Sequence, residues 1–288
     1  MEPDPVALAE AVRVALAEDL GHAGDITTKA IVRIDQPGRA HIVAKSQGLL
    51  AGVSVASQVF SAVDKKTTIV WDLDDGDTFA AGDTIAQLSG RAMAILAAER
   101  VALNFLQHLS GVATSTRRFV DICEPFGVKV LCTRKTLPGL RDLQRYAIVL
   151  GGGHLHRKGL FDAILIKTNH GKLAASLTEA VRRAKAGSRE EVEVEAASIQ
   201  EVEEALAAGA EKVLLDNADV PTIAKAVEIT RGKAYLEVSG GIDLELARQI
   251  APLQPDAISV GRITHSVEAI DFSLQILGPA GGAPIHGA

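Results

Sequence analysis

The 288-residue sequence is poor in aromatic side chains, which make up 3% of it, and it contains only two cysteines. Few aromatic rings leave little for stacking nucleic-acid bases, and they predict a core built from aliphatic side chains. Cys123 and Cys132 lack the Cys-x-x-Cys spacing, which argues against a disulfide framework or a structural zinc site. We therefore interpret both thiols as core residues.

Long apolar runs are also missing. No stretch of about 18 apolar residues is present to span a membrane, and the first nine residues lack the basic start and apolar segment of a signal peptide. We therefore expect a cytoplasmic protein without a membrane partner. With 47% hydrophobic residues, the chain is large enough for one large domain or two smaller ones.

Positive charge is scarce overall but concentrated in one segment. The formal net charge is -6, yet residues 129–172 hold nine Lys or Arg against two acids, Asp142 and Asp162. This concentration favours a pocket for a small polyanion, with a solvated basic face as the alternative. Nucleic acid is disfavoured as a partner, because this segment offers only Tyr146 and Phe161 for stacking.

The first 120 residues change pattern twice. Residues 5–19 have the apolar spacing of an amphipathic helix, residues 38–90 contain short β-like runs separated by glycines, and residues 91–119 predict a long helix. Residues 74–90 resemble the hairpins of biotinyl and lipoyl carrier domains. No lysine stands at a hairpin tip, however, so we interpret this stretch as a structural β layer.

After residue 125, short aliphatic runs alternate with helical stretches, and no Gly-x-Gly-x-x-Gly fingerprint is present. One helix is predicted between Pro138 and the triple glycine at 151–153. Repeated βα units predict a parallel sheet, here a small closed α/β barrel rather than a doubly wound sheet. The predicted strands are 128–131, 163–166, 192–194, 212–215, 234–236 and 257–260.

Polar or glycine residues follow each predicted strand, where a barrel places its chemistry. Water-exposed strand ends also favour polar residues, but here the residues sort by chemistry: cations after the first two strands, acids after the next two and glycines after the last two. The residues are Arg134, Lys135, Lys167, Glu195, Asp216, Ser239, Gly240, Gly241, Gly261 and Arg262.

This sorting suggests a role for each group. The Ser239–Gly241 and Val260–Arg262 segments suit phosphate binding through backbone N–H groups. Glu195 and Asp216 suit sugar hydroxyls or a Mg²⁺ ion that also binds substrate phosphates; the alternative is that they pair with Lys167 or Arg157. Arg157, beside His156, suits bidentate binding of carboxylate or phosphate.

The sequence resembles the quinolinate phosphoribosyltransferase family over nearly its full length. The motifs that carry the resemblance are Glu18-Asp19-Leu20-Gly21, Gly24-Asp25-Ile26-Thr27, Glu99-Arg100-Val101-Ala102-Leu103-Asn104, Ser110-Gly111-Val112-Ala113-Thr114, Thr133-Arg134-Lys135-Thr136 with Pro138-Gly139, the triple glycine with His156-Arg157, Leu215-Asp216-Asn217, Ser239-Gly240-Gly241 and Thr264-His265-Ser266.

The resemblance implies an α/β protein of the type II phosphoribosyltransferase class. It would have an N-terminal α/β sandwich domain at residues 1–112, a mostly parallel α/β barrel at 113–270, and a segment at 271–288 that returns to the first domain. It also implies a homodimer or larger homo-oligomer in which Arg100 reaches the neighbouring subunit's site.

The implied enzyme is a pentosyltransferase, the carboxylating nicotinate-nucleotide diphosphorylase of NAD biosynthesis. It would convert quinolinate and phosphoribosyl pyrophosphate, with Mg²⁺, into nicotinate mononucleotide, pyrophosphate and CO₂. Lys135, Lys167, Glu195 and Asp216 would be catalytic, the two acids also meeting the metal largely through substrate and water, with Glu193 as an alternative acid. Substrate binding would use these four residues together with Arg100, Thr133, Arg134, His156, Arg157, Ser239, Gly240, Gly241, Val260, Gly261 and Arg262.

Two positions depart from the family pattern. Thr168 stands where members usually have an acid, and Leu155 stands where many have asparagine. These departures keep open the molybdenum-transport-associated relatives of the same fold. Two further alternatives are a phosphosugar aldolase with Lys167 as its Schiff-base lysine and a phosphoribosyl pyrophosphate sensor without turnover.

Overall fold

The computed structural model describes residues 3–277, which fall into two compact units. Of these residues, unit 1 contains 3–115, 137–151 and 267–277, and unit 2 contains 116–136 and 152–266. The expected boundary between 112 and 113 lies inside one continuous helix, α4 (Ala92–Cys123). Residues 278–288 of the expected returning segment lie outside the described part. No helix within residues 3–277 is long and apolar enough to cross a membrane.

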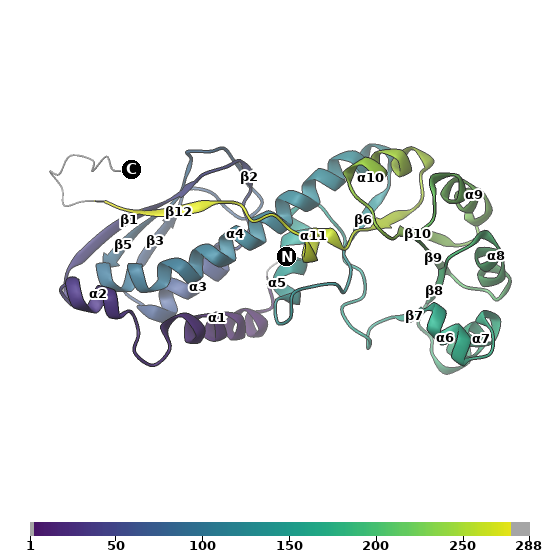
Figure 1. The fold of residues 1–288 in the computed structure, drawn as a ribbon, viewed down its shortest axis with the longest axis horizontal. Helices are drawn as coiled ribbons and strands as arrows, with labels where there is room; N and C mark the ends of the chain where they lie inside the picture. The colour runs from purple at the N-terminus through teal and green to yellow at the C-terminus, as the bar shows by residue number, and fades with distance from the viewer. Residues whose placement is uncertain (1–2, 278–288) are drawn as a thin grey trace. The chain divides into compact units, whose positions relative to one another are not determined.

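Unit 1 is built on an antiparallel sheet with the strand order β12-β1-β5-β3. Ala40, Ile42 and Ala44 of β1 are fully buried and alternate with more exposed residues, so the sheet has one core face. Figure 1 shows helices α3 and α4 running beside this sheet. The strands of the unit are β1 (Pro37–Ala44), β2 (Gly48–Leu49), β3 (Thr68–Trp71), β4 (Thr78–Phe79), β5 (Thr84–Arg91) and β12 (Phe272–Ile276), with β2 paired to β4.

The first and last of the predicted N-terminal elements are confirmed as helices α1 (Pro5–Leu20) and α4. The carboxylate of Asp4 caps α1 by accepting the backbone N–H of Val6 at 2.8 Å. The helix expected to open at Pro138 begins later, because Gly139 has a φ of +79°, outside the helical region. The remaining helices of the unit are α2 (Ile26–Ile31), α3 (Val53–Val63) and α5 (Arg141–Leu150).

Unit 2 contains a parallel sheet, and all the strands predicted after residue 125 are confirmed. Within residues 3–277 the strand order is β6-β11-β10-β9-β8-β7, and no pairing joins β7 to β6. The barrel is therefore open on this side, unlike the closed barrel expected, because His154 instead forms a parallel bridge with Leu131 of β6. The strands are β6 (Lys129–Leu131), β7 (Ile164–Ile166), β8 (Val192–Ala196), β9 (Lys212–Asp216), β10 (Tyr235–Ser239) and β11 (Ala257–Ser259).

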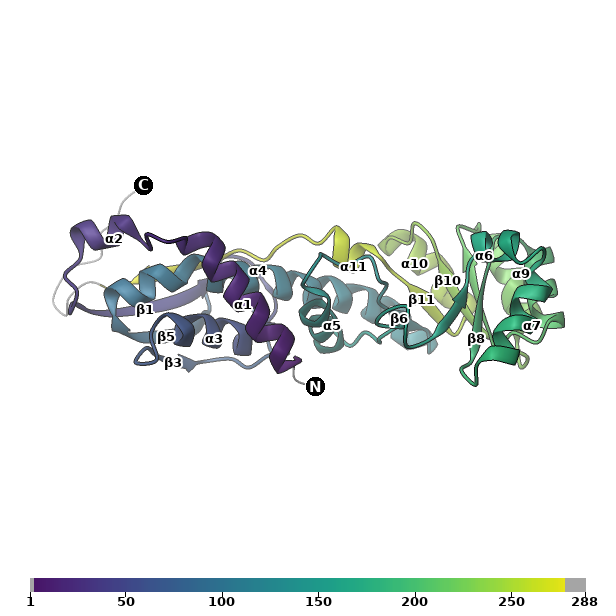
Figure 2. The same ribbon diagram turned by 90° about the horizontal axis from the view of Figure 1, so that it is seen from below.

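Helices cover the outside of this sheet, as Figure 2 shows for α7 and α9. Ser176, Ser198, Asp219 and Asp243 cap four of them, each accepting a backbone N–H from the first helical turn. The caps end each connecting loop at a fixed point and so fix where the next helix starts. The helices are η1 (Glu124–Phe126), α6 (Thr168–Leu173), α7 (Leu177–Gly187), α8 (Ile199–Ala207), α9 (Val220–Thr230), α10 (Leu244–Ile250), η2 (Ala251–Leu253) and α11 (Arg262–His265).

Candidate active site in the barrel unit

A cavity of about 220 Å³ lies at the carboxyl ends of the parallel strands in unit 2. Predicted cations, acids and a hydroxyl come together in its wall, although they are spread over more than a third of the chain. The lining residues are Cys132, Thr133, Arg134, Lys135, His156, Arg157, Leu165, Lys167, Glu195, Leu214, Asp216, Glu237, Ser239 and Ser259.

Strand periodicity explains why these side chains converge. Residues two apart on a strand point to the same face, so Leu214 and Asp216 of β9 both face the cavity. The parallel register then places Leu214 opposite both Glu195 of β8 and Glu237 of β10. Neighbouring strands thus present polar groups at the same height of the barrel.

Glu195 is held by the end of strand β7. Its Oε2 accepts a short hydrogen bond from the ammonium of Lys167, and its Oε1 accepts bonds from the Thr168 hydroxyl at 3.2 Å and the Thr168 N–H at 3.4 Å. Burial raises the pKa of Glu195, but the hydrogen bond and charge of Lys167 and the two bonds from Thr168 together outweigh it, and the net pKa lies below the usual value. Glu195 is therefore an ionised carboxylate, and Thr168 supports it where an acid would repel it.

The loop after β6 is fixed by helix α11. The backbone oxygen of Lys135 accepts a 2.8 Å hydrogen bond from the hydroxyl of Thr264, and the N–H of Lys135 donates to Thr133 Oγ1 at 3.1 Å. Gly261 lies so close that an added Cβ would come 3.1 Å from Lys135 Cδ. Gly261 therefore leaves room for the stem of the lysine.

Arg134 and Arg157 are close enough to influence each other. Burial lowers the pKa of Arg157, and the neighbouring charge of Arg134 lowers it further. Two half-buried guanidinium groups on one cavity wall repel each other. An anion bound between them offsets this repulsion, which favours its binding. This pair therefore suits binding of an anion in the cavity.

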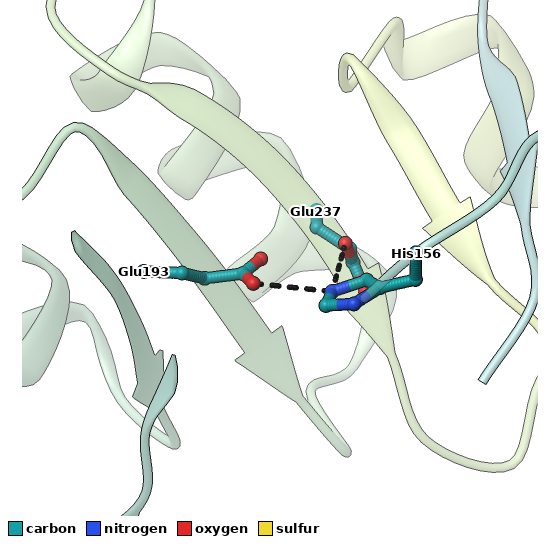
Figure 3. Close-up of side chains that lie close together, drawn as sticks. All are labelled: His156, Glu193 and Glu237. Carbon is teal, nitrogen blue, oxygen red and sulfur yellow. Dashed lines mark ion pairs between the residues drawn. The ribbon is translucent and has the colours of Figure 1, made fainter. Parts of the chain in front are cut away.

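His156 lies deeper and contacts two buried carboxylates. Its Nε2 lies 3.1 Å from Glu193 Oε2 and 3.4 Å from Glu237 Oε2, as Figure 3 shows. Burial lowers the pKa of His156, but the hydrogen bonds to these two carboxylates and their charges reverse this and raise the pKa above its usual value. Glu193, the predicted alternative acid, therefore contacts His156 beneath the cavity.

Several predicted site residues lie outside the cavity wall. Gly240 packs against Asn217, Gly241 is exposed, Val260 and Gly261 lead into α11, and Arg262 is exposed at the start of that helix. Arg100 is exposed on α4 in unit 1. The cavity wall itself thus brings together Thr133, Arg134, Lys135, His156, Arg157, Lys167, Glu195, Asp216 and Ser239.

Sequence reasoning missed part of the wall, namely Cys132, Leu165, Leu214, Glu237 and Ser259. Glu237 carried a usable signal, because a carboxylate in the middle of a buried parallel strand is rare without a partner. Cys132 is buried, as predicted for both thiols. It also accepts a hydrogen bond from the N–H of His156 at 3.3 Å.

The carboxylates of Glu195 and Asp216 fit the donor set that Mg²⁺ prefers, hard oxygens completed by water and substrate phosphate. Both line the same cavity, and Asp216 Oδ2 accepts the side-chain amide of Asn217 at 2.8 Å. Among residues 3–277, the three side chains whose ligand atoms lie close enough together to hold one metal ion are instead those of His156, Glu193 and Glu237. Its nitrogen–oxygen distances are those of hydrogen bonds.

Comparisons with known proteins point to one family. Family models described as the N- and C-terminal domains of quinolinate phosphoribosyl transferase match residues 25–110 and 112–275. The chloroplastic carboxylating nicotinate-nucleotide pyrophosphorylase of Arabidopsis thaliana is 39% identical, over 92% of this chain and 81% of that protein. The decarboxylating quinolinate phosphoribosyltransferase 2b of Nicotiana tabacum is 37% identical, over 93% and 82%.

Solved structures agree with these matches. The nicotinate-nucleotide pyrophosphorylase of Francisella tularensis superposes with a TM-score of 0.91 at 42% identity, covering 96% of this chain and 98% of that chain. The corresponding protein of Ehrlichia chaffeensis gives a TM-score of 0.92 at 37% identity, covering 96% and 100%.

Proposed function

The chain belongs to the quinolinate phosphoribosyltransferase family, and we propose that the cavity of unit 2 carries out the reaction of that family. The enzyme transfers the phosphoribosyl group of phosphoribosyl pyrophosphate to quinolinate with decarboxylation, a step of NAD biosynthesis. The products are nicotinate mononucleotide, pyrophosphate and CO₂.

The cationic wall is proposed to bind quinolinate. Arg134 and Arg157 lie close together on it, and Lys135 lines the same cavity. The two carboxylates of the substrate would relieve the repulsion between the guanidinium groups and gain charge-assisted hydrogen bonds. Thr133 and His156 complete this wall.

We propose that Glu195 and Asp216, the acidic wall of the cavity, act on the sugar. Departure of pyrophosphate leaves positive charge on the ribose, and the ionised Glu195 together with Asp216 would stabilise it through the ribose hydroxyls. Lys167 holds Glu195 in place and meets substrate phosphate or carboxylate. Ser239 and the backbone of 240–241 and 260–262 would bind phosphate. Mg²⁺, when bound by Glu195, Asp216 and substrate, would offset the charge of the pyrophosphate.

The bond changes need no nucleophile from the protein. The ring nitrogen of quinolinate bonds to the anomeric carbon as the bond to pyrophosphate breaks. The resulting pyridinium accepts the electron pair left when the adjacent carboxylate departs as CO₂, and that carbon then takes a proton. Positioning and electrostatics supply most of the rate.

One observation carries this proposal: cations and acids predicted at separate strand ends line one cavity. The test is release of CO₂ and nicotinate mononucleotide from quinolinate, phosphoribosyl pyrophosphate and Mg²⁺, run beside nicotinate. Equal amounts of both products support the proposal. Turnover of nicotinate alone would indicate a changed base pocket near Leu155 and Thr168. No turnover of either quinolinate or nicotinate would favour the sensor or the molybdenum-associated relatives.

The aldolase alternative is less compatible with the geometry. A Schiff-base lysine must offer a free amine electron pair, whereas the Lys167 ammonium is hydrogen-bonded to Glu195. Borohydride trapping with a phosphosugar aldehyde should therefore leave the protein unlabelled. Covalent labelling of Lys167 would support the aldolase alternative.

We further propose that the enzyme is a homodimer or larger homo-oligomer in which Arg100 reaches the active site of the neighbouring subunit. Its exposure on α4 supports this role. Mixing inactive Arg100→Ala with inactive Lys135→Ala should restore activity, because a mixed dimer then contains one intact site. No recovery after subunit exchange would place Arg100 in its own subunit's site or remove it from catalysis.

A further inference from the structure

Two buried acids, Glu193 and Glu237, lie in the interior of the barrel beside the proposed quinolinate wall, and Glu237 also lines the cavity. The Glu193 side chain is 8% exposed and that of Glu237 is 2% exposed, and the two come from strands β8 and β10, on either side of β9. Figure 3 shows both carboxylates directed at one ring nitrogen of His156. Neither acid was assigned a part in the reaction above.

Burying two carboxylates this close together is costly unless another group compensates them. Burial raises the pKa of Glu237, the hydrogen bond from His156 opposes this, and the neighbouring charge of Glu193 adds to the rise. A proton on His156 Nε2 that is shared between the two acids supplies the compensation. The two acids and the ring therefore form one unit.

The other side of the ring leads to Arg157. The backbone N–H of Arg157 donates to His156 Nδ1 at 2.7 Å, so Nδ1 carries no proton and the single ring proton lies on Nε2. The backbone N–H of His156 donates to Cys132 Sγ. Both ring nitrogens are therefore engaged inside the chain. The ring links strands β8 and β10 to the backbone that carries the guanidinium of Arg157.

We propose that Glu193 and Glu237 are positioning residues for quinolinate binding, which hold the backbone of Arg157 in place through the ring of His156. The inference rests on the proposed function, since it assigns Arg157 to a substrate carboxylate. Both ring nitrogens of His156 take part in this linkage.

The first test measures the affinity of the folded enzyme for each substrate by calorimetry. Glu193→Ala and Glu237→Ala should each weaken quinolinate binding by about tenfold, the effect of about one lost hydrogen bond, and change phosphoribosyl pyrophosphate binding by less than about twofold. Glu193→Gln and Glu237→Gln keep an acceptor oxygen and should recover most of the affinity. Equal loss for both substrates, or no loss, would overturn the inference.

Control variants come from two acids that bond to the opposite ends of the same strands. Glu211 accepts the N–H of Val192 at the start of β8, and Asp256 accepts the N–H of Leu236 near the start of β10. Glu211→Gln and Asp256→Asn should leave quinolinate affinity unchanged. If they weaken it as much as the Glu193 and Glu237 variants do, general loosening of the barrel explains the effect and the inference fails.

A second test asks whether the acids act through the ring. His156→Asn keeps an acceptor for the Arg157 N–H but is too short to reach the acids, so adding Glu193→Ala to it should cause little further loss of quinolinate affinity. Full additivity would contradict the linkage. Nitrogen NMR of the His156 ring adds a readout without substrate: its signals should shift in Glu193→Ala and Glu237→Ala, and unchanged signals would overturn the inference even in an inactive protein. Failure of the wild type to bind quinolinate would instead overturn the proposed function.

Discussion

Gly240 lies against Asn217 so closely that an added Cβ would come 2.5 Å from the Asn217 backbone nitrogen. The glycine also has a φ of +95°, a conformation that side chains rarely adopt. The contact joins the loops after β9 and β10, where Asp216 and Ser239 line the cavity. A side chain at position 240 would therefore push apart two parts of the proposed sugar and phosphate site.

Gly240→Ala should destabilise the protein by about 2–4 kcal/mol, because steric overlap adds to backbone strain. It should also weaken binding of phosphoribosyl pyrophosphate. Gly241→Ala is the matched control: its φ is +59°, but nothing lies within 4 Å of the added Cβ, so only about 1 kcal/mol is expected. Thermal unfolding and calorimetry measure both effects, and equal costs would argue against the contact with Asn217.

Arg134→Ala and Arg157→Ala should each weaken quinolinate binding by about 1.5–3 kcal/mol, the value of a hydrogen bond between charged groups. The thermal unfolding temperature should change little. Lys172→Ala removes an exposed cation from α6 and should leave quinolinate affinity unchanged. Unaltered affinity in both arginine variants would remove them from the proposed carboxylate site.

Asp216→Asn should lower kcat on the order of a hundredfold, because the lost charge acts mainly on the developing oxocarbenium ion. Quinolinate affinity should change far less, since Asp216 lies on the acidic wall. Single-turnover kinetics beside equilibrium binding separate the two quantities. A loss confined to quinolinate binding would contradict the assigned role.

Acid should destabilise unit 1 through His108. Burial lowers the pKa of this histidine below its usual value of 6.5, and the Gln144 side-chain amide lies 2.9 Å from its Nε2. A lowered folded-state pKa means that the unfolded chain binds the proton more readily. The contribution of His108 is therefore complete above pH 6.5 and is lost as the pH falls through the folded-state pKa.

His108→Gln, which cannot titrate, should flatten the fall in stability that begins as the pH drops below about 6.5. Denaturant unfolding at a series of pH values measures the change. Glu18 and Asp19 line the same cavity as His108, so Glu18→Gln serves to check that these acids do not cause the slope. An unchanged slope in His108→Gln would contradict the assignment.

The strands of the barrel were predictable because aliphatic runs followed by polar residues show both the strand and its end. The fixed parallel register then brings Lys167, Glu195 and Asp216 together, so most of the cavity wall followed from sequence. Its depth did not. Glu193 and Glu237 belong to the site only because β8 and β10 flank β9, and strand order is not written in any single strand. The opening between β7 and β6 likewise depends on the bridge at His154, which no local pattern predicts.

The pairing of β12 with β1 affects how the chain is made. Ala40 pairs with Ile276, so one edge of the first sheet stays unpaired until residue 276 has been synthesised. An open strand edge is a site of misassembly during synthesis. The parallel sheet of unit 2 needs the chain only up to Ser259, which pairs with Leu131, so it can be completed before β12 closes the sheet of unit 1.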